Sequence, residues 1–241
     1  EVSGYIDWIY FFHAWGFSPR KTQTPEAMQL LQEAKEMLEL LDKNFQTHAV
    51  LRLMDANSEE NDIWIEGTRF PFLRQQTAKE EEPYLCLSDF IRPSSSKIKD
   101  KIGLFATTVD AEMEQLYTED PYLHMLVKTL ADRLAEATAE KTHDTIRKEF
   151  QGIRPAVGYP SLPDQSVNFL LDELLDMQQI GIHLTENGMM QPHASVSGLI
   201  FTHPASRYFS VGKIDEQQLK DYAIRRGLPI GQMRKFLARN L

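Results

Sequence analysis

The chain has little cysteine and no clustered histidine. Cys86 is the single cysteine among 241 residues, which excludes an internal disulfide and any zinc site built on several thiolates. The seven histidines are scattered, and no two of them stand at helical ligand spacing, so we expect no metal site built by this chain. The single cysteine fits a reducing compartment, and we expect a cytoplasmic protein.

The sequence also lacks an excess of positive charge and any long hydrophobic run. It holds 26 Lys and Arg against 35 Asp and Glu, a formal net charge of −9, which argues against a nucleic-acid partner. The aromatic-rich opening from Tyr5 to Phe17 contains Asp7 and is too short to span a bilayer. We therefore expect neither a signal peptide nor a membrane helix. Because residue 1 is Glu rather than Met, we expect the chain to have been trimmed at its start.

Common catalytic signatures are missing as well. The sequence contains no glycine-rich fingerprint for dinucleotides or phosphates, no nucleophile elbow and no metalloprotease helix motif. These absences disfavour the enzyme classes that such motifs mark.

Amphipathic periodicity predicts several helices. Thr24-Pro25-Glu26 has the N-cap, proline and acid typical of a helix start, and apolar residues then recur at spacings of three and four as far as Phe45. Similar patterns, with capping residues and terminal glycines, predict four further helices. They cover residues 123–146, a stretch from Asp164 or Ser166 to Gly181, residues 215–227, and a stretch from residue 229.

Short runs of apolar and β-branched residues predict strands. They lie at residues 49–54, 63–65, 84–90 and 102–109, and residues 195–214 predict a strand–turn–strand hairpin. Polar stretches at 75–83 and 93–101 are predicted to be surface loops. Strands and helices do not alternate as βαβ units, so we expect an α+β fold, a single domain over residues 1–241 with a twisted, largely antiparallel sheet flanked by helices.

The most unusual segment is GIRPAVGYPSLPD, from Gly152 to Asp164. Three prolines and two glycines pre-organise this loop around Arg154 and Tyr159. Gly158 permits a close backbone approach to a ligand, the Arg154 guanidinium matches a carboxylate, and Tyr159 offers a flat face with a polar tip. These groups suit recognition of an amino acid. From the residues alone, a rigid surface turn with Arg154 in an ion pair is an equally good interpretation.

The same run resembles the Arg-x-x-x-Gly-Tyr motif of the activation domain of cobalamin-dependent methionine synthase. Four more stretches resemble that family: GYIDW from Gly4, YLCLSDFI from Tyr84, LADRLAEATAE from Leu130 and ASVSGLIFTHPASRYFSVGKI from Ala194. Together the stretches are specific and span nearly the whole chain. Two departures from the family pattern are Phe209, where a tyrosine often sits, and a shorter segment between the helix at 123–146 and Phe150.

The resemblance implies a binding site for S-adenosylmethionine (AdoMet). Arg154 would bind the AdoMet carboxylate, and Asp7 would accept hydrogen bonds from its α-ammonium group. The backbone around Pro155, Ala156 and Gly158 would approach the ligand, and Tyr159, Tyr208 and Phe209 would flank its adenosyl or sulfonium portion. Without the resemblance, a surface hydrogen bond for Asp7 and a core position for Tyr208 are the better interpretations.

Two acids of the helix predicted at 123–146 share one face. Asp132 and Glu136 lie four residues apart, and Glu140 follows one turn further on. Such acids are usually solvated, and Lys128 is placed to pair with Asp132. In the family, matching acids face the AdoMet site or the cobalamin domain, where one can receive the histidine that leaves the cobalt during reactivation.

The family's reaction repairs a cobalamin whose cobalt has been oxidised to an inactive state. Flavodoxin or another reductant supplies one electron, and AdoMet then methylates the resulting cob(I)alamin. This chain has too few cysteines for the homocysteine-activating zinc site and no Asp-x-His-x-x-Gly cobalamin motif. We therefore expect a partner domain or chain to bind the cobalamin. The chain would then be part of methionine synthase and not catalytic alone.

Two other functions stay open. A non-catalytic sensor or assembly module would keep the fold and the AdoMet affinity without taking part in reactivation. An unrelated AdoMet methyltransferase is the other alternative, although the chain lacks the glycine-rich βα turn of the commonest such fold.

Overall fold

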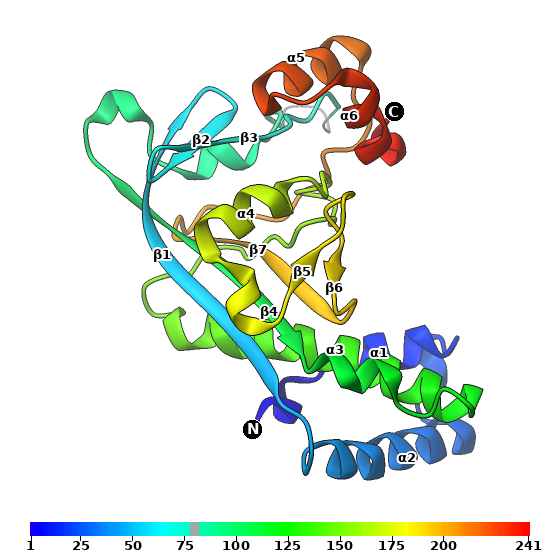
Figure 1. Cartoon of the computed structure of the whole chain (residues 1–241). Coiled ribbons are helices and arrows are strands. Elements are labelled where there is room, and N and C mark those ends of the chain that lie inside the picture. Colours follow the sequence, from blue (N-terminus) through cyan, green and yellow to red (C-terminus); the bar gives the residue numbers. More distant parts are fainter. Residues whose placement is uncertain (78–81) are drawn as a thin grey trace.

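A five-stranded antiparallel sheet forms the centre of the computed structural model, which describes residues 1–77 and 82–241 (Figure 1). The strand order is β3-β2-β1-β4-β7. The strands are β1 (Thr47–Glu59), β2 (Asp62–Ile65), β3 (Thr68–Pro71), β4 (Asp100–Val109) and β7 (Ser195–Phe201). A separate two-stranded ribbon pairs β5 (His183–Leu184) with β6 (Met190–Gln191).

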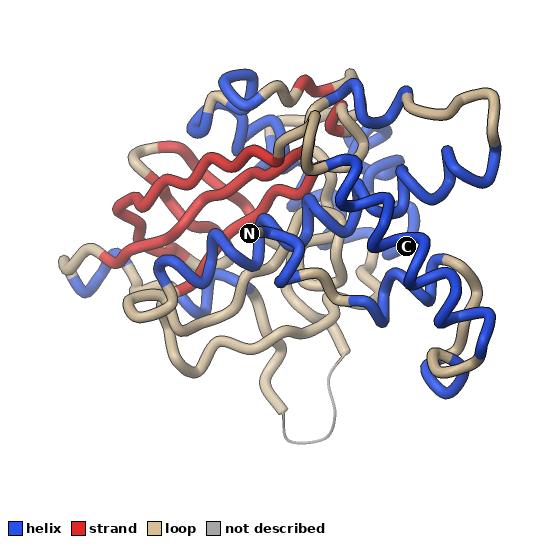
Figure 2. The backbone as a smooth tube through the Cα atoms, turned by 90° about the horizontal axis from the view of Figure 1, so that it is seen from below, coloured by secondary structure: helices blue, strands red, loops and turns tan. Residues whose placement is uncertain are grey.

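Most of the helices lie to one side of the strands in a second view, and shorter ones lie above and below them (Figure 2). The α-helices are α1 (Trp8–Ala14), α2 (Pro25–Leu41), α3 (Pro121–Ile146), α4 (Val167–Leu175), α5 (Glu216–Arg226) and α6 (Ile230–Phe236). The 3-10 helices are η1 (Val2–Tyr5), η2 (Pro19–Lys21), η3 (Leu87–Phe90), η4 (Ser94–Ser96), η5 (Ala111–Gln115), η6 (Met177–Ile180) and η7 (Ala238–Asn240). The predicted α+β fold with an antiparallel sheet is confirmed. Within the described residues, no helix is long and apolar enough to cross a membrane.

Side chains of β4 and β7 alternate between two cores, one on each face of the sheet. Leu104 and Leu199 pack in the same cluster as the apolar side chains of α4. Phe105 and Ile200, each one residue further along its strand, pack with the alanines of α3. Because both faces are covered, β4 reads as a nearly continuous apolar run instead of an alternating one.

The two ends of the chain pack at opposite ends of the sheet (Figure 1). Helices α1 and α2 share a core with α3. Helices α5 and α6 form a separate cluster with Leu73 and Val211. The half-buried Arg225 of α5 ties this C-terminal unit to the sheet, because its Nη1 lies 2.5 Å from Oδ1 of Asp62 on β2.

A buried polar group joins the C-terminal unit to the end of the segment 152–164. The Tyr222 hydroxyl donates to Oδ2 of Asp164 at 2.7 Å, and both side chains are buried. Asp164 also accepts from the backbone N–H and the hydroxyl of Ser166, at 2.9 and 2.8 Å. Burial raises the pKa of the Tyr222 phenol well above its ordinary value, so the hydroxyl remains a donor.

Replacing Tyr222 with phenylalanine is expected to lower the free energy of unfolding by about 1.5–3 kcal/mol, since it removes a buried hydrogen bond to a charged group. Urea denaturation followed by circular dichroism measures this. The matched control is Tyr84→Phe, at an exposed hydroxyl, with an expected change within about 0.5 kcal/mol. Equal losses for the two variants would contradict the importance of the buried group.

The strand predicted at residues 84–90 is wrong. That segment turns into η3 because the Asp89 carboxylate accepts from the backbone N–H of Cys86 at 2.8 Å. The same carboxylate receives both ends of the Arg74 guanidinium, at 2.7 Å each. Four residues of this stretch, Leu85, Cys86, Leu87 and Phe90, are buried, but the Asp89 contacts curl the backbone.

Other boundaries also differ from the predictions. Helix α1 and strand β3 were not predicted, β1 is longer than residues 49–54, and α2 ends at Leu41 rather than Phe45. The helix predicted at 164–181 is split, because Asp176 adopts a φ of 54° between α4 and η6. Of the loop predicted at 75–83, residues 78–81 lie outside the described residues.

Candidate functional site

The segment 152–157 lies against β7 and extends the sheet by one irregular strand. The backbone N–H of Leu199 donates to the Pro155 carbonyl at 3.1 Å, and that of Val157 donates to the Ser197 carbonyl at 2.9 Å. Gly198 makes this approach possible, because a Cβ there would lie 2.3 Å from the Pro155 oxygen. The loop that carries Arg154 is therefore held by the sheet rather than free in solvent.

This pairing also explains why the predicted hairpin at 195–214 is wrong. The edge of β7 that a second hairpin strand would need is occupied by residues 152–157. The chain instead crosses the loop, where the backbone N–H of Phe209 donates to the Ser161 hydroxyl at 3.1 Å and that of Val211 donates to the Pro160 carbonyl at 2.9 Å. Tyr208 and Phe209 are thereby fixed beside Arg154.

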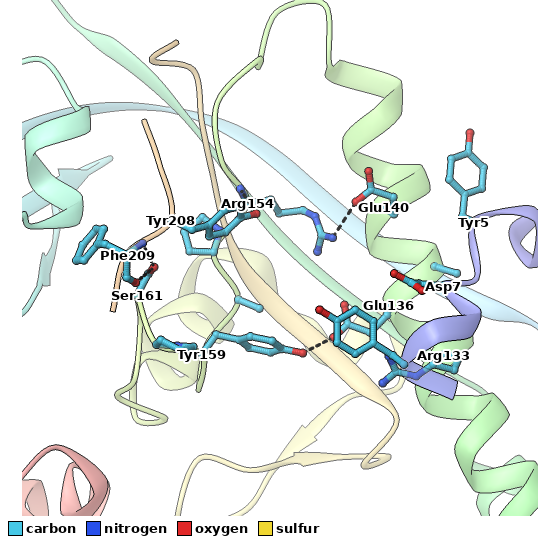
Figure 3. A pocket seen from close by; sticks show the side chains of 15 residues that line it. Tyr5, Asp7, Arg133, Glu136, Glu140, Arg154, Tyr159, Ser161, Tyr208 and Phe209 are labelled. Atoms are coloured by element: carbon cyan, nitrogen blue, oxygen red, sulfur yellow. Dashed lines mark hydrogen bonds and ion pairs between the residues drawn. The ribbon is translucent and has the colours of Figure 1, made fainter. Parts of the chain in front are cut away.

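The Arg154 guanidinium is largely buried and has two partners. It lies over the Phe105 ring at 5.3 Å, and its Nη2 donates to Oε2 of Glu140 on α3 at 3.1 Å (Figure 3). Burial by itself raises the pKa of the Glu140 carboxyl, but Arg154 and Arg147 outweigh that effect and lower the pKa. The ion pair that sequence alone suggested for Arg154 is therefore present, and it lies in the wall of a cavity.

The cavity has a volume of about 760 Å³. It lies where η1, α1, α3, the segment 152–164 and residues 208–209 meet (Figure 3). Eight residues predicted from sequence line it: Asp7, Glu136, Arg154, Pro155, Ala156, Tyr159, Tyr208 and Phe209. The volume falls in the range of about 300–1,000 Å³ that is usual for small-molecule sites.

Asp7 is exposed at the cavity and caps α1. Its Oδ1 accepts from the backbone N–H of Ile9 at 2.9 Å, which leaves the other carboxylate oxygen available. Asp7 comes from the start of α1 and Arg154 from the loop beside β7, so opposite charges approach one cavity from different elements (Figure 3). A ligand with an ammonium and a carboxylate group would complement this arrangement.

Aromatic side chains form much of the remaining wall. The Tyr159 hydroxyl donates to Oε1 of Glu136 at 2.7 Å, and the Tyr208 hydroxyl accepts from the backbone N–H of Arg154 at 3.0 Å. Partial burial and the Glu136 carboxylate raise the pKa of the Tyr159 phenol, so it is a neutral donor at physiological pH. The two rings offer faces for stacking or for contact with a cation.

Two predicted site residues do not line the cavity. Gly158 has a φ of 87°, and a side chain there would meet nothing within 4 Å, so the left-handed backbone is what favours glycine. Asp132 is exposed on α3. The helix presents Arg133, Glu136, Ala137 and Glu140 to the cavity, a face with spacings of three and four that leaves out Asp132.

Seven further residues line the cavity: Tyr5, Tyr10, Arg133, Ala137, Glu140, Pro160 and Ser161. Of these, sequence reasoning had singled out only Glu140, as an acid one turn beyond Glu136. Arg133 could also have been found, because it lies three residues from Glu136 on the same helix. Tyr5 and Tyr10 carry no such signal, since only tertiary packing brings the N-terminal segment to α3. Among the described residues, no group of three or more His, Cys, Asp or Glu side chains could hold a metal ion.

Comparisons with known proteins agree with this architecture. A sequence model of the family described as "Vitamin B12 dependent methionine synthase, activation domain" matches residues 1–227. A crystal structure of the MetH reactivation domain bound to AdoHcy is 36% identical to this chain, with a TM-score of 0.91. The alignment covers 100% of this chain and 87% of that one. The chain therefore belongs to the family of vitamin B12-dependent methionine synthase activation domains.

Proposed function

We propose that this activation domain binds AdoMet in the cavity around Arg154 and supports the reductive reactivation of methionine synthase. The observation that carries the proposal is the presence of a guanidinium and a carboxylate, from Arg154 and Asp7, in one cavity with aromatic walls. AdoMet has a carboxylate, an ammonium and a sulfonium group that match these three features. The similar MetH domain is bound to AdoHcy, which supports the same ligand class.

The chain's own residues would contribute binding and orientation. Arg154 would bind the carboxylate, Asp7 would accept from the α-ammonium group, and Tyr159 and Tyr208 would flank the adenosyl or sulfonium portion. AdoMet supplies an electrophilic methyl group, and a reduced cobalamin held by a partner domain or chain supplies the nucleophile. No protein base is needed, so the domain would act by holding the methyl group in line for displacement.

The cobalamin and the electron would come from partners. Because the sequence has no Asp-x-His-x-x-Gly cobalamin motif, we expect another domain to hold the cobalamin, in cis or in trans. Flavodoxin or an equivalent reductant would supply the electron. The scarcity of cysteine fits the cytoplasm as the place of this reaction.

Isothermal titration calorimetry tests the ligand. We expect AdoMet to bind with one site per chain and S-adenosylhomocysteine to compete with it, because both carry the amino-acid and adenosyl groups. Absence of both AdoMet heat and competition would refute the assignment. The second step is to add a cobalamin domain of methionine synthase with a reductant and to follow cobalamin methylation by absorbance. Binding without methylation would favour the sensor or assembly function instead.

A further inference from the structure

Glu140 lies between two arginines at the edge of the cavity. Its Oε2 accepts from Nη2 of Arg154 at 3.1 Å, and its Oε1 accepts from Nη2 of Arg147 at 2.5 Å. The Arg154 side chain is 12% exposed, whereas the Arg147 side chain is 52% exposed. One carboxylate is thus shared between a buried cavity cation and a surface cation (Figure 3 shows the Arg154 contact).

Glu140 occupies the group that a ligand carboxylate would need. Glu140 and Arg154 line the same cavity, and the Arg154 side chain points from the loop beside β7 toward Glu140 on α3 (Figure 3). The Glu140 side chain is 41% exposed, so a rotamer change can move it away from Arg154 without disturbing the core. Arg147, seven residues further along and just beyond the end of α3, offers the displaced carboxylate a second partner.

We propose that Glu140 is an internal competitor for the ligand carboxylate at Arg154, and that Arg147 sets how strongly it competes. The proposal rests on the proposed function, because it assumes that the cavity takes AdoMet. Glu140 would then control affinity for ligands that carry an amino-acid carboxylate, and it would keep Arg154 paired before the ligand arrives.

The charge state of Glu140 supports this role. Although burial raises the pKa of the carboxyl, the hydrogen bonds and charges of Arg154 and Arg147 lower it overall, so Glu140 is ionised at neutral pH. Glu140 therefore presents Arg154 with an ionised carboxylate, the same chemical group that AdoMet would present.

Direct competition and the long-range electrostatic field predict opposite results for Glu140→Gln. AdoMet carries two positive groups and one negative group, so removing a nearby negative charge weakens its binding if only the overall field matters. If Glu140 competes for Arg154, the same substitution strengthens binding. The direction of the change therefore distinguishes the two.

The experiment compares affinities by isothermal titration calorimetry. We expect Glu140→Gln to bind AdoMet about threefold to tenfold more tightly than the wild type, the size expected for removing one partly exposed charged contact. Decarboxylated S-adenosylmethionine should gain nothing, because it has no group for Arg154. The matched control is Glu149→Gln, which removes the same charge at an exposed position that makes no contact with Arg154, Glu140 or Arg147 among the hydrogen bonds and ion pairs described. It should leave the affinities for AdoMet and for its decarboxylated analogue unchanged.

Arg147 gives a second, opposite test. Arg147→Gln should weaken AdoMet binding, because Glu140 then has only Arg154 as a partner. The same substitution in a Glu140→Gln background should have no effect. If Glu140→Gln unfolds, as judged by circular dichroism, the Arg147 arm alone decides, and unchanged or tighter AdoMet binding in that variant would overturn the proposal.

Three results would overturn the inference. They are unchanged or weaker AdoMet binding in folded Glu140→Gln, an equal gain for the decarboxylated analogue, and an effect of Arg147→Gln other than a weakening that disappears in the Glu140→Gln background. In each of these cases the wild type binds AdoMet, so the proposed function survives. A wild type that binds no AdoMet would overturn the proposed function and this inference with it.

Discussion

Replacing Arg154 with alanine is expected to weaken AdoMet binding by roughly a hundredfold, about 3 kcal/mol. The substitution removes the planar donor group that would bind the ligand carboxylate in a largely buried position. It also leaves Glu140, on the same cavity wall, with Arg147 as its remaining cation, so a negative charge would face the incoming carboxylate. Calorimetric titration of the purified domain measures the loss.

Two further variants separate recognition from folding and from overall charge. Arg154→Lys keeps the charge but not the two-pronged geometry, so it should recover only part of the affinity. Arg239→Ala removes an exposed arginine near the C-terminus and should bind as the wild type does. A thermal melt should accompany each titration, because Arg154 also packs on Phe105. Wild-type affinity in a folded Arg154→Ala variant would refute the assigned carboxylate site.

Replacing Gly198 with alanine is expected to destabilise the domain by about 1–3 kcal/mol or more and to weaken ligand binding at the same time. The new Cβ would lie 2.3 Å from the Pro155 carbonyl oxygen and 2.9 Å from Cα of Ala156. Both are backbone atoms, so the contact cannot be relieved by turning a side chain. The segment 152–157 must move off β7, and Arg154 moves with it.

Gly231→Ala is the matched control. A Cβ at Gly231 would meet nothing within 4 Å, and the residue lies in helix α6, where alanine is favoured over glycine. This variant should be unchanged or slightly more stable. Urea denaturation gives the free energies and AdoMet titration gives the affinities. A Gly198→Ala variant as stable as Gly231→Ala would show that the loop does not depend on close contact with β7.

Elements with strong local signals were predictable. Apolar periodicity predicted a helix at 123–146, and the structure has α3 over Pro121–Ile146. The Asp120 carboxylate caps this helix by accepting from two backbone N–H groups at 3.0 Å. Thr24 caps α2 and Asp215 caps α5 in the same way. Such caps use residues two or three positions apart, so short-range pattern reading detects them.

Elements whose conformation depends on contacts with distant segments could not be predicted from the sequence. The segment 84–90 has the apolar content of a strand, but Asp89 is held by Arg74, which lies fifteen residues earlier in the chain. The second strand of the hairpin predicted at 195–214 does not form, because residues 152–157, far away in sequence, occupy the edge of β7. Periodicity contains no information about which segment takes a free edge.

The family, the α+β class and the unusual loop around Arg154 could be predicted from the amino-acid sequence, because several specific stretches and local periodic patterns carry them. The binding roles of the individual residues stay predictions. Three features of the site come from packing between segments: Asp7 and Arg154 line one cavity, Asp132 is not among its lining residues, and the Arg154 guanidinium is already paired with Glu140. These outcomes depend on how α1, α3 and the edge of β7 pack together, which is a property of contacts between segments and not of any one segment.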